Sequence, residues 1–494
     1  MALRRKAGET KPLLNFRPVL FLLGILLAVL SVFMLVPAIA DYAENNPDWQ
    51  GFCRAAALTF FTGTTLMLMT RTDRPVMNIR QAFVMTVLAW LLLPAMAALP
   101  FTFADLDMDY TNAYFEAMSG LTTTGATVMT NLQQMPPGIL LWRSILQGLG
   151  GIGILVMAVA LLPILRVGGM QLFRMEFSER LEKGLPRAAE VGFGITMIYG
   201  ALILTCAILY WLGGMSAFDA ANHAMTTLSN GGFSTRDESF GAYDSWIIDV
   251  TAVVFMTAGA LPFVLYLRAV NQDIRALLTD SQVHWFLMFL GGAIFILTAY
   301  LVLKHEMGSL AILRETIFSA GSIMTGTGFV ITDYQLWGTF PQILFFILMF
   351  VGGCAGSASC GLKIFRFQVL FQAVRIQLNK LVKPHGVFIP QYNRRALPET
   401  VMEAVVVYFF VFMVIYAIIT AVLAMLGLDF LTAASAAVSM LSCVGPGLGD
   451  IIGPSGNYAP LSAPVKWVLA MAMLLGRLEL MTVLAVLTPA FWKS

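Results

Sequence analysis

The chain has 494 residues, of which 58% are hydrophobic and 12% charged, and its formal net charge is +2. Soluble domains carry about 25% charged residues. A mean hydropathy of +0.79 leaves too little polar surface to cover a water-exposed globule. The composition therefore predicts an all-α integral membrane protein with many spans, and the near-neutral charge gives no support for a nucleic-acid partner.

Apolar runs recur along the whole chain, and each is long enough to cross a hydrocarbon core about 30 Å thick. The five cysteines and four histidines are scattered without metal-ligand or disulfide-framework spacing, so we interpret them as packing residues. The apolar runs predict spans at roughly 17–40, 52–70, 81–103, 138–165, 191–213, 245–267, 283–303, 340–362, 401–426 and 465–491.

Lys and Arg gather in alternate connections between these spans. They precede the first span, follow the second, fourth and sixth, and fill the stretch 363–395, which contains no acid. The other connections are poor in basic residues and hold acids such as Asp105, Asp107 and Asp109. The positive-inside rule then predicts that both termini are cytoplasmic. The stretch 363–395 is expected to face a cytosolic partner or anionic membrane lipid.

Four short segments, one after each of the third, fifth, seventh and ninth spans, share a pattern that ends in glycine. A hydroxyl stands three residues before each glycine and another stands six before it. The glycines lie about a hundred residues apart, so the chain repeats a unit of span, short segment and span. The segments are 115–125, 222–232, 318–328 and 435–445.

The repeat predicts how the chain is divided. A segment of about ten residues reaches only half-way across the membrane as a helix and must turn back. Irregular backbone at that depth is tolerated only inside protein or beside water, so the four turning points should face one central pore. The expected parts are two N-terminal helices (1–76) and four pore repeats (77–188, 189–280, 281–395 and 396–494).

This geometry favours a cation. Helices that end near the membrane centre direct the negative ends of their dipoles at the axis. A glycine permits positive φ, so successive carbonyls can aim inward and replace the hydration shell of an ion. The predicted filter residues are Thr124, Gly125, Gly231, Gly232, Thr327, Gly328, Val444 and Gly445.

The eighth span contains a run of glycine and small polar residues that disfavours a continuous helix. We expect a loop that lines the pore, with a tight helix-packing seam as the alternative. The residues concerned are Gly352, Gly353, Gly356, Ser357 and Gly361, with Lys363 at the end of the loop.

Arg477 lies near the middle of the predicted last span, where a guanidinium costs at least about 2.5–3.5 kcal/mol. We expect it to face the pore as a barrier to cations. The alternative is a salt bridge with an acid on another span, because Glu479 is too close along the helix to face it. Arg143, near the outer end of its span, is expected to snorkel. Residues 148–153 fit GxGxxG but lack a strand–helix context, so they predict close helix contact.

The motifs at 122–127, 230–235, 325–330 and 443–449 resemble the TrkH/KtrB/HKT superfamily of potassium transporters, most closely its TrkH branch. Trp142, Arg143 and Ser144 also look like this family. The resemblance covers nearly the whole chain. It implies K+ at the carbonyls of the filter residues, an intramembrane loop that acts as a gate below the filter, and no organic cofactor. It also implies a homodimer with one pore per chain and a cytosolic TrkA-like nucleotide-binding regulatory subunit.

In plant HKT-type relatives, a serine at the first filter glycine accompanies sodium transport, so glycine at all four positions favours potassium. Ala126 and Pro446 depart from the phenylalanine that follows the other two filter glycines. The sequence thus predicts potassium uptake across the bacterial inner membrane, either downhill or by symport with H+ or Na+. A carrier of small organic solutes is the main alternative, which paired inverted repeats would favour. No catalytic set of residues in proper context supports an enzyme.

Overall fold

The computed structural model describes residues 15–71, 77–160, 186–271, 275–304, 309–393 and 395–493. Within these ranges the regular structure is helical except for one two-stranded antiparallel hairpin, which pairs β1 (Gln391–Tyr392) with β2 (Arg395–Ala396). The predicted all-α class is confirmed. The basic residues at 4–6 and 166–183, which contributed to the predicted orientation, lie outside the described residues.

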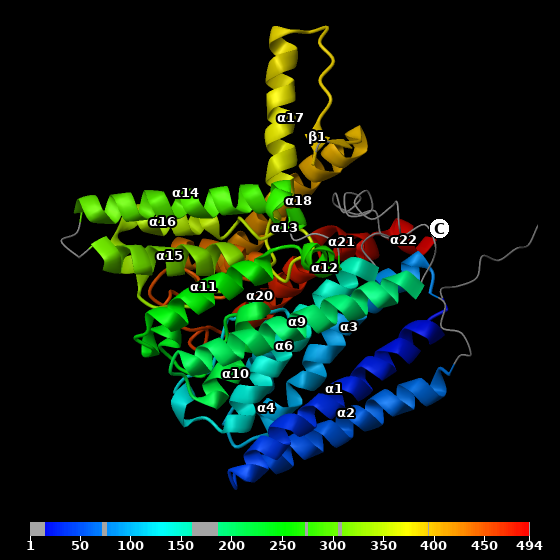
Figure 1. Ribbon diagram of the computed structural model, residues 1–494. Coiled ribbons are helices and arrows are strands. Elements are labelled where there is room, and N and C mark those ends of the chain that lie inside the picture. The colour runs from blue at the N-terminus through cyan, green and yellow to red at the C-terminus, as the bar shows by residue number, and fades with distance from the viewer. Residues whose placement is uncertain are drawn as a thin grey trace, which may run out of the picture.

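Seven of the ten predicted spans are long apolar helices that are continuous enough to cross a membrane. Many of their large apolar side chains are exposed, as at Phe61, Leu68 and Phe295, and these face lipid in a membrane protein. In Figure 1 these helices run roughly side by side across the molecule. They are α1 (Arg17–Ala43), α2 (Trp49–Met69), α3 (Ile79–Ala97) with α4 (Leu99–Phe103), α6 (Pro137–Ala160), α9 (Pro186–Leu212), α14 (Ser281–Lys304) and α18 (Glu399–Met425).

The other three predicted spans are broken. The predicted spans 245–267 and 465–491 are each a bent pair of helices: α11 (Trp246–Ala260) and α12 (Phe263–Asn271) meet at 96°, and α20 (Ala463–Arg477) and α21 (Leu480–Leu487) meet at 108°. At the first bend, Pro262 lies directly before α12. At the second bend, Glu479 adopts φ +59°. The eighth predicted span is a short helix, α16 (Thr339–Leu348), followed by irregular backbone, as the sequence predicted.

Four short helices end inside the protein: α5 (Tyr110–Leu121), α10 (Ala217–Leu228), α15 (Ser309–Thr325) and α19 (Phe430–Ser442). Three begin with a side-chain cap, in which Asp109, Ser216 or Asp429 accepts a hydrogen bond from the backbone N–H of the third residue of the helix. Their C-terminal halves are buried although they are rich in hydroxyl groups. They are the predicted pore helices, and they start earlier in the chain than the repeated segments.

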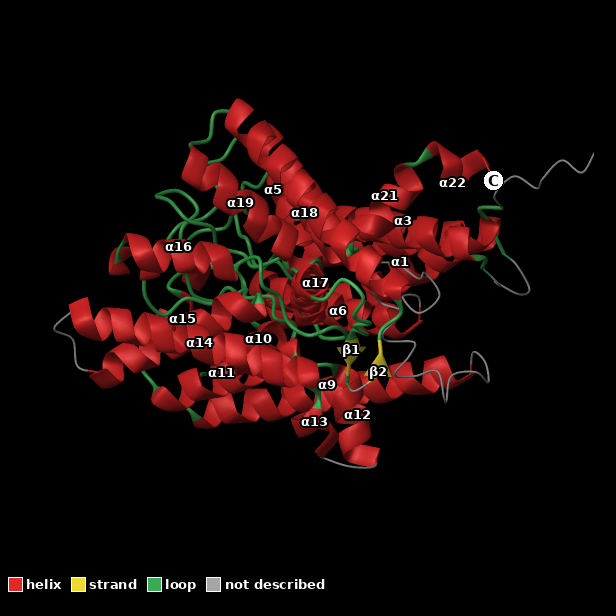
Figure 2. Ribbon diagram, turned by 90° about the horizontal axis from the view of Figure 1, so that it is seen from above, coloured by secondary structure: helices red, strands yellow, loops and turns green. Residues whose placement is uncertain are grey.

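The helix α17 (Ile364–Val382) begins directly after the irregular stretch of the eighth span and stands away from the body of the protein (Figure 1). Figure 2 shows it end-on while α14 and α9 run across the view, so α17 lies nearly perpendicular to the spans. The hairpin β1–β2 returns the chain from α17 to α18. The remaining short helices are α13 (Arg275–Thr279), α22 (Pro489–Lys493), η1 (Leu132–Gln134), η2 (Ser239–Ala242) and η3 (Tyr334–Trp337).

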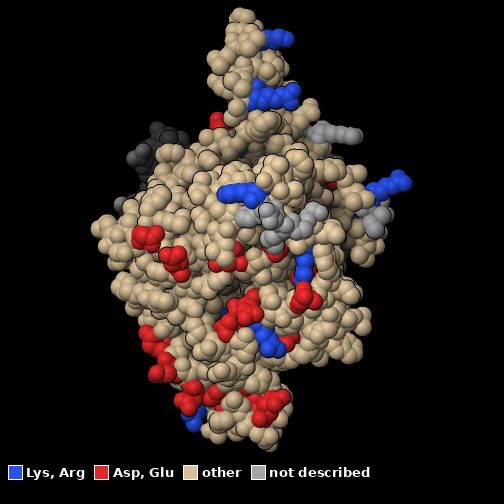
Figure 3. All heavy atoms as spheres, turned by 90° about the vertical axis from the view of Figure 1, so that its left-hand side faces the viewer, with Lys and Arg blue, Asp and Glu red and all other residues tan. Residues whose placement is uncertain are grey.

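The face of the molecule that carries the loops before and after the pore helices is acidic. Figure 3 looks onto this face and shows Asp and Glu spread over it with few Lys or Arg. Exposed acids in the connections around the pore helices include Asp105, Asp107, Asp237 and Asp450. An acidic surface raises the local concentration of cations.

The pair α1 and α2 packs through two glycines. A Cβ added at Gly63 would lie 2.8 Å from the carbonyl oxygen of Gly24, and one at Gly24 would lie 2.6 Å from that of Gly63. Small residues allow such close approach of membrane helices. By contrast, Gly200 in α9 has no heavy atom within 4 Å of an added Cβ.

We therefore expect Gly63→Ala to destabilise the protein by about 1–3 kcal/mol, because the backbone of α1 cannot move away without repacking. Gly200→Ala makes the same chemical change without the clash and is the matched control. Thermal unfolding of the detergent-purified proteins measures the difference. Equal unfolding temperatures for the two variants would contradict the close packing of α1 and α2.

Candidate functional site

The four pore helices end in the same backbone geometry. We call Gly125, Gly232, Gly328 and Gly445 the filter glycines. The residue just before each of them donates its N–H to a carbonyl five residues back, at 2.9 Å in all four repeats. The residue two before each glycine is left-handed, with φ between +51° and +74°, which is a helix C-cap conformation. The donor and acceptor pairs are Thr124 to Ser119, Gly231 to Thr226, Thr327 to Ser322 and Val444 to Ser439.

Only the third repeat has glycine at the left-handed position, Gly326. The others place Thr123, Asn230 and Cys443 there. Asparagine tolerates this conformation, whereas a β-branched threonine at φ +52° is strained. The repeated motif gives no signal for this second turn, because three of the four residues at this position are not glycine. The filter glycines themselves have φ of +85°, +79°, +77° and +102° in chain order, as the prediction that they permit inward carbonyls requires.

The four filter glycines meet in a closed ring. A Cβ added at Gly125 would lie 2.2 Å from the carbonyl oxygen of Gly231. An added Cβ at Gly232 would lie 1.8 Å from the carbonyl oxygen of Thr327. One at Gly328 would lie 2.0 Å from that of Val444, and one at Gly445 would lie 2.7 Å from that of Thr124. Each repeat thus touches the next, and the fourth touches the first. The structure brings all eight predicted filter residues together.

Hydrogen bonds hold the ring from behind. The side chain of Gln147 in α6 donates to the carbonyl of Gly231 at 2.6 Å and accepts from the N–H of Phe233 at 3.1 Å. The carbonyl of Gly445 accepts from the hydroxyls of Ser439 at 3.0 Å and Tyr458 at 2.8 Å. The supports therefore differ from repeat to repeat, and Gln147 and Tyr458 had no signal in the repeated motif.

A buried ion pair joins the first two filter segments. Arg143 Nε lies 2.8 Å from Glu116 Oε1, and both side chains are buried. Glu116 also accepts from the N–H of Val128 at 2.9 Å, while Arg143 donates to the carbonyl of Ser234 at 2.8 Å. The guanidinium lies 4.2 Å from the centre of the Phe233 ring. The prediction that Arg143 snorkels is wrong, because Glu116, twenty-seven residues earlier, provides a buried partner.

Glycines of the following helices let them pack against the pore-helix ends. An added Cβ at Gly150 in α6 would lie 2.0 Å from the carbonyl oxygen of Leu121, four residues before the filter glycine. Gly259 in α11 and Gly476 in α20 approach the equivalent carbonyls of Leu228 and Leu441. The contact predicted for the 148–153 motif is thus found at Gly150. In the third repeat the irregular stretch of the eighth span replaces such a helix.

We call residues 349–363 the intramembrane loop. It is almost entirely buried, and Gly356 and Gly361 adopt φ of +76° and +75°. Two of its N–H groups are paired with the end of α11: Cys354 donates to the carbonyl of Ala260 at 2.9 Å and Ala358 to that of Gly259 at 3.0 Å. These bonds attach the loop to the bend between α11 and α12.

The intramembrane loop contacts the cap turns of the pore helices. An added Cβ at Gly326 would lie 3.6 Å from Ser359 Oγ, and one at Gly361 would lie 3.5 Å from Ser442 Cβ. Ser357 donates to the carbonyl of Cys354 at 2.6 Å, and the Lys363 ammonium donates to the carbonyl of Ser359. The loop is folded on itself through Gly352, which lies against the Cys360 carbonyl, and through the bond from the N–H of Gly353 to Ser359 Oγ at 3.0 Å. The predicted gating residues thus lie together, next to the filter segments.

Arg477 ends α20 at the bend and is buried. It donates to the carbonyl of Ala358 at 3.0 Å and to Cys360 Sγ at 3.0 Å, both in the intramembrane loop, and to the carbonyl of Gly150 at 2.8 Å. Among the described residues no carboxylate lies within ion-pair distance of Arg477. The alternative of a salt bridge is therefore not supported in this part of the chain.

Glu479, which follows Arg477, pairs instead with Arg366 at the start of α17. The Arg366 guanidinium also lies 3.6 Å from the centre of the Tyr408 ring in α18. Together these contacts join α17, α18 and the bend between α20 and α21, three residues after the intramembrane loop ends. No spacing pattern in the sequence relates Arg366 to Glu479, which lie 113 positions apart.

Comparison with known proteins identifies the family. The model of the TrkH family, described as a cation transport protein, matches residues 48–493. The Trk system potassium uptake protein TrkI of Halomonas elongata is 41% identical over 499 residues, covering 100% of both chains. TrkH of Escherichia coli K12 is 34% identical, covering 97% of this chain and 100% of that protein.

The fold agrees with a solved structure. The crystal structure of the potassium transporter TrkH from Vibrio parahaemolyticus superposes with a TM-score of 0.91 at 34% identity, over 97% of this chain and 100% of the other. The family model, the sequence relatives and the solved structure all point to the same family. The chain belongs to the TrkH family of cation transport proteins, and it is a multi-pass membrane transporter rather than an enzyme.

Proposed function

We propose that this chain takes up potassium across the bacterial inner membrane through a single pore, with both termini in the cytoplasm. The observation that carries the proposal is the closed ring in which the glycine of each repeat touches the carbonyl of the next. Four carbonyls from one chain around one centre can replace the hydration shell of an ion. The printed names of the relatives, potassium uptake proteins of the Trk system, support K+ as the substrate.

We assign the ring of K+ ligands to the carbonyls that approach the neighbouring glycines: those of Thr124, Gly231, Thr327 and Val444. The filter glycines Gly125, Gly232 and Gly328 supply further carbonyls. Gly445 differs, because its carbonyl already accepts two hydrogen bonds, which occupy both lone pairs. The carbonyl of Gly231 accepts one, from Gln147, and keeps a second lone pair for an ion. In the fourth repeat Val444 is therefore the principal ligand.

The proposed gate is the intramembrane loop held by Arg477. Gly352, Gly353, Gly356, Ser357, Gly361 and Lys363 form this loop. A guanidinium beside the ion pathway repels a cation, and its hydrogen bonds to Ala358 and Cys360 hold the loop in place. Release of these bonds would move the loop and the charge together.

We further propose the division of the chain into two N-terminal helices (1–76) and pore repeats 77–188, 189–280, 281–395 and 396–494, which the fourfold cap geometry supports. The assembly is a homodimer with one pore per chain. A cytosolic TrkA-like nucleotide-binding subunit regulates the gate, in keeping with the Trk system to which the relatives belong. The basic stretch from Lys363 to Arg395 is the proposed surface for that subunit or for anionic lipid.

The ring predicts a graded effect of alanine at the filter glycines. Gly232→Ala brings the added carbon closest to a carbonyl, at 1.8 Å, and Gly445→Ala leaves the most room, at 2.7 Å. We expect Gly232→Ala to lower Rb+ uptake by at least about tenfold, equivalent to about 1.4 kcal/mol, and Gly445→Ala to lower it less. Uptake is measured in a potassium-auxotrophic bacterium that expresses this chain.

Gly148→Ala in α6 is the control, since its nearest contacts are 3.9 Å away. Gly125→Ser should weaken K+ flux or make it tolerant of Na+. Unaltered Rb+ uptake in Gly232→Ala, or no uptake by the parent chain with its cytosolic partner present, would contradict the proposed filter.

The buried ion pair behind the filter predicts a loss of stability. Glu116→Gln leaves the guanidinium of Arg143 buried without a counter-charge, and breaking such a pair costs about 3–5 kcal/mol. We expect a lower unfolding temperature and reduced flux. Arg54→Gln, which alters an exposed arginine, is the control and should change neither. Parental stability in Glu116→Gln would show that the pair does not support the filter.

The gate predicts a gain of flux. Arg477→Ala removes both the charge and the bonds to the intramembrane loop, so we expect it to raise K+ flux in proteoliposomes that lack the cytosolic partner. Arg477→Lys keeps the charge but not the forked donors and should give a smaller increase. A well-folded Arg477→Ala protein with unchanged flux would reject the gating role.

A further inference from the structure

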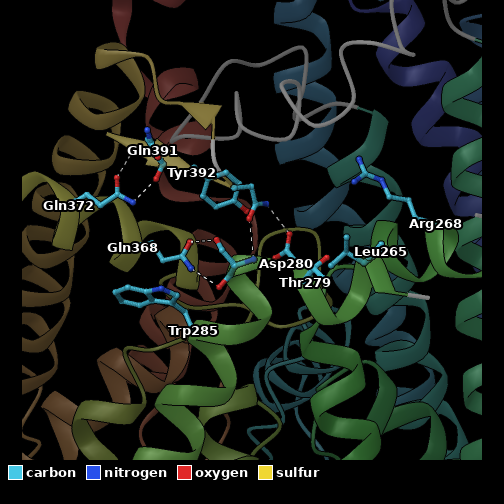
Figure 4. A pocket seen from close by; sticks show the side chains of 12 residues that line it. Leu265, Arg268, Thr279, Asp280, Trp285, Gln368, Gln372, Gln391 and Tyr392 are labelled. Atoms are coloured by element: carbon cyan, nitrogen blue, oxygen red, sulfur yellow. Dashed lines mark hydrogen bonds between the residues drawn. The ribbon is translucent and has the colours of Figure 1, made fainter. Parts of the chain in front are cut away.

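A cavity of about 640 Å³ lies where α13, the start of α14, α17 and the β1–β2 hairpin meet. Figure 4 shows Gln368 and Gln372 of α17, Gln391 and Tyr392 of the hairpin, and Asp280 and Trp285 at the start of α14 around it. Its wall is part polar and part apolar, and it is partly open to solvent. It lies on the side of the spans where α17 and the hairpin project, which the proposed orientation assigns to the cytoplasm.

The first residues of α14 are fixed to the hairpin. Asp280 Oδ1 accepts the N–H of Gln282 at 2.8 Å and so caps the helix. Asn393 of the hairpin donates to Asp280 Oδ2 at 3.0 Å and accepts the N–H of Ser281 at 3.1 Å. Gln368 of α17 donates to the carbonyl of Ser281 at 2.8 Å. Movement of the hairpin or of α17 therefore acts directly on the beginning of α14.

Gln282 connects this junction to the intramembrane loop. Its amide nitrogen donates to the hydroxyl of Tyr392 in the hairpin at 2.6 Å. Its amide oxygen accepts the N–H of Ala355, in the middle of the loop, at 2.9 Å. The side chain is buried, so each bond lost would leave a buried polar group without water to replace it. One planar amide thus joins the wall of the cavity to the proposed gate.

We infer that Gln282 is a positioning residue through which the β1–β2 hairpin sets the position of the intramembrane loop. The inference rests on the proposed function and concerns its regulation. A shift of Tyr392 either breaks its hydrogen bond to Gln282 or moves the Gln282 amide with it. In both cases the intramembrane loop is affected, because the same amide accepts the N–H of Ala355. The cavity gives a ligand or a partner on the cytosolic side a place from which to move the hairpin.

The test fills the cavity chemically and asks whether the loop responds. Gln391→Cys places a thiol on the cavity wall, and a bulky charged methanethiosulfonate reagent then occupies the space. We expect modification to change K+ flux in proteoliposomes by about fivefold or more, a coupling typical of linked sites. The same modification in a Gln282→Leu or Tyr392→Phe background should leave flux nearly unchanged.

Two controls isolate the effect. Val374→Cys puts the thiol on an exposed position of α17 that does not line the cavity, and the chain without an added cysteine reports any reaction of its own thiols. Tyr392→Phe removes one hydroxyl only, so it keeps the test valid if Gln282→Leu fails to fold. Mass spectrometry confirms labelling in each protein.

The inference would be overturned if labelling of Gln391→Cys changed K+ flux equally with and without the Gln282 amide. It would also be overturned if full labelling of Gln391→Cys did not change the flux. Either result leaves K+ flux itself intact. Absence of K+ flux from the unmodified parent chain would instead count against the proposed function.

Discussion

The structure depends on one constraint: polypeptide that turns inside a membrane must have its polar backbone groups satisfied without bulk water. The four pore helices meet this constraint with one cap, in which an N–H next to each filter glycine returns to a carbonyl of the last helical turn at 2.9 Å. The cap uses the turn's own N–H groups and leaves carbonyls to converge. The proposed cation site thus follows from how the turns are closed.

The chain satisfies the same constraint differently around each repeat. Gln147 supports the second filter segment, Ser439 and Tyr458 support the fourth, and the Glu116–Arg143 pair ties the first to the second. In the third repeat the intramembrane loop takes the position that a packed helix holds elsewhere. This asymmetry is available because the repeats belong to one chain and need not be identical. It confines the proposed gate, the intramembrane loop, to a single side of the ring.

Much of the architecture could be predicted from sequence, because apolar length and a hundred-residue repeat are local or periodic signals. They located seven continuous spans, the four glycine turns and the break in the eighth span. They failed for the bends after Ala260 and Arg477, where apolar composition continues across a change of direction. They also failed for Arg143 and Gln282, whose roles depend on partners that no spacing rule connects to them.

The central claim is that carbonyls of the four repeats surround one cation. An anomalous-difference map of the protein crystallised in Rb+ tests it most directly. The account predicts a peak on the axis of the ring, within coordination distance of the carbonyl oxygens of Thr124, Gly231, Thr327 and Val444. Rb+ bound only elsewhere, with the ring empty at saturating Rb+, would contradict it.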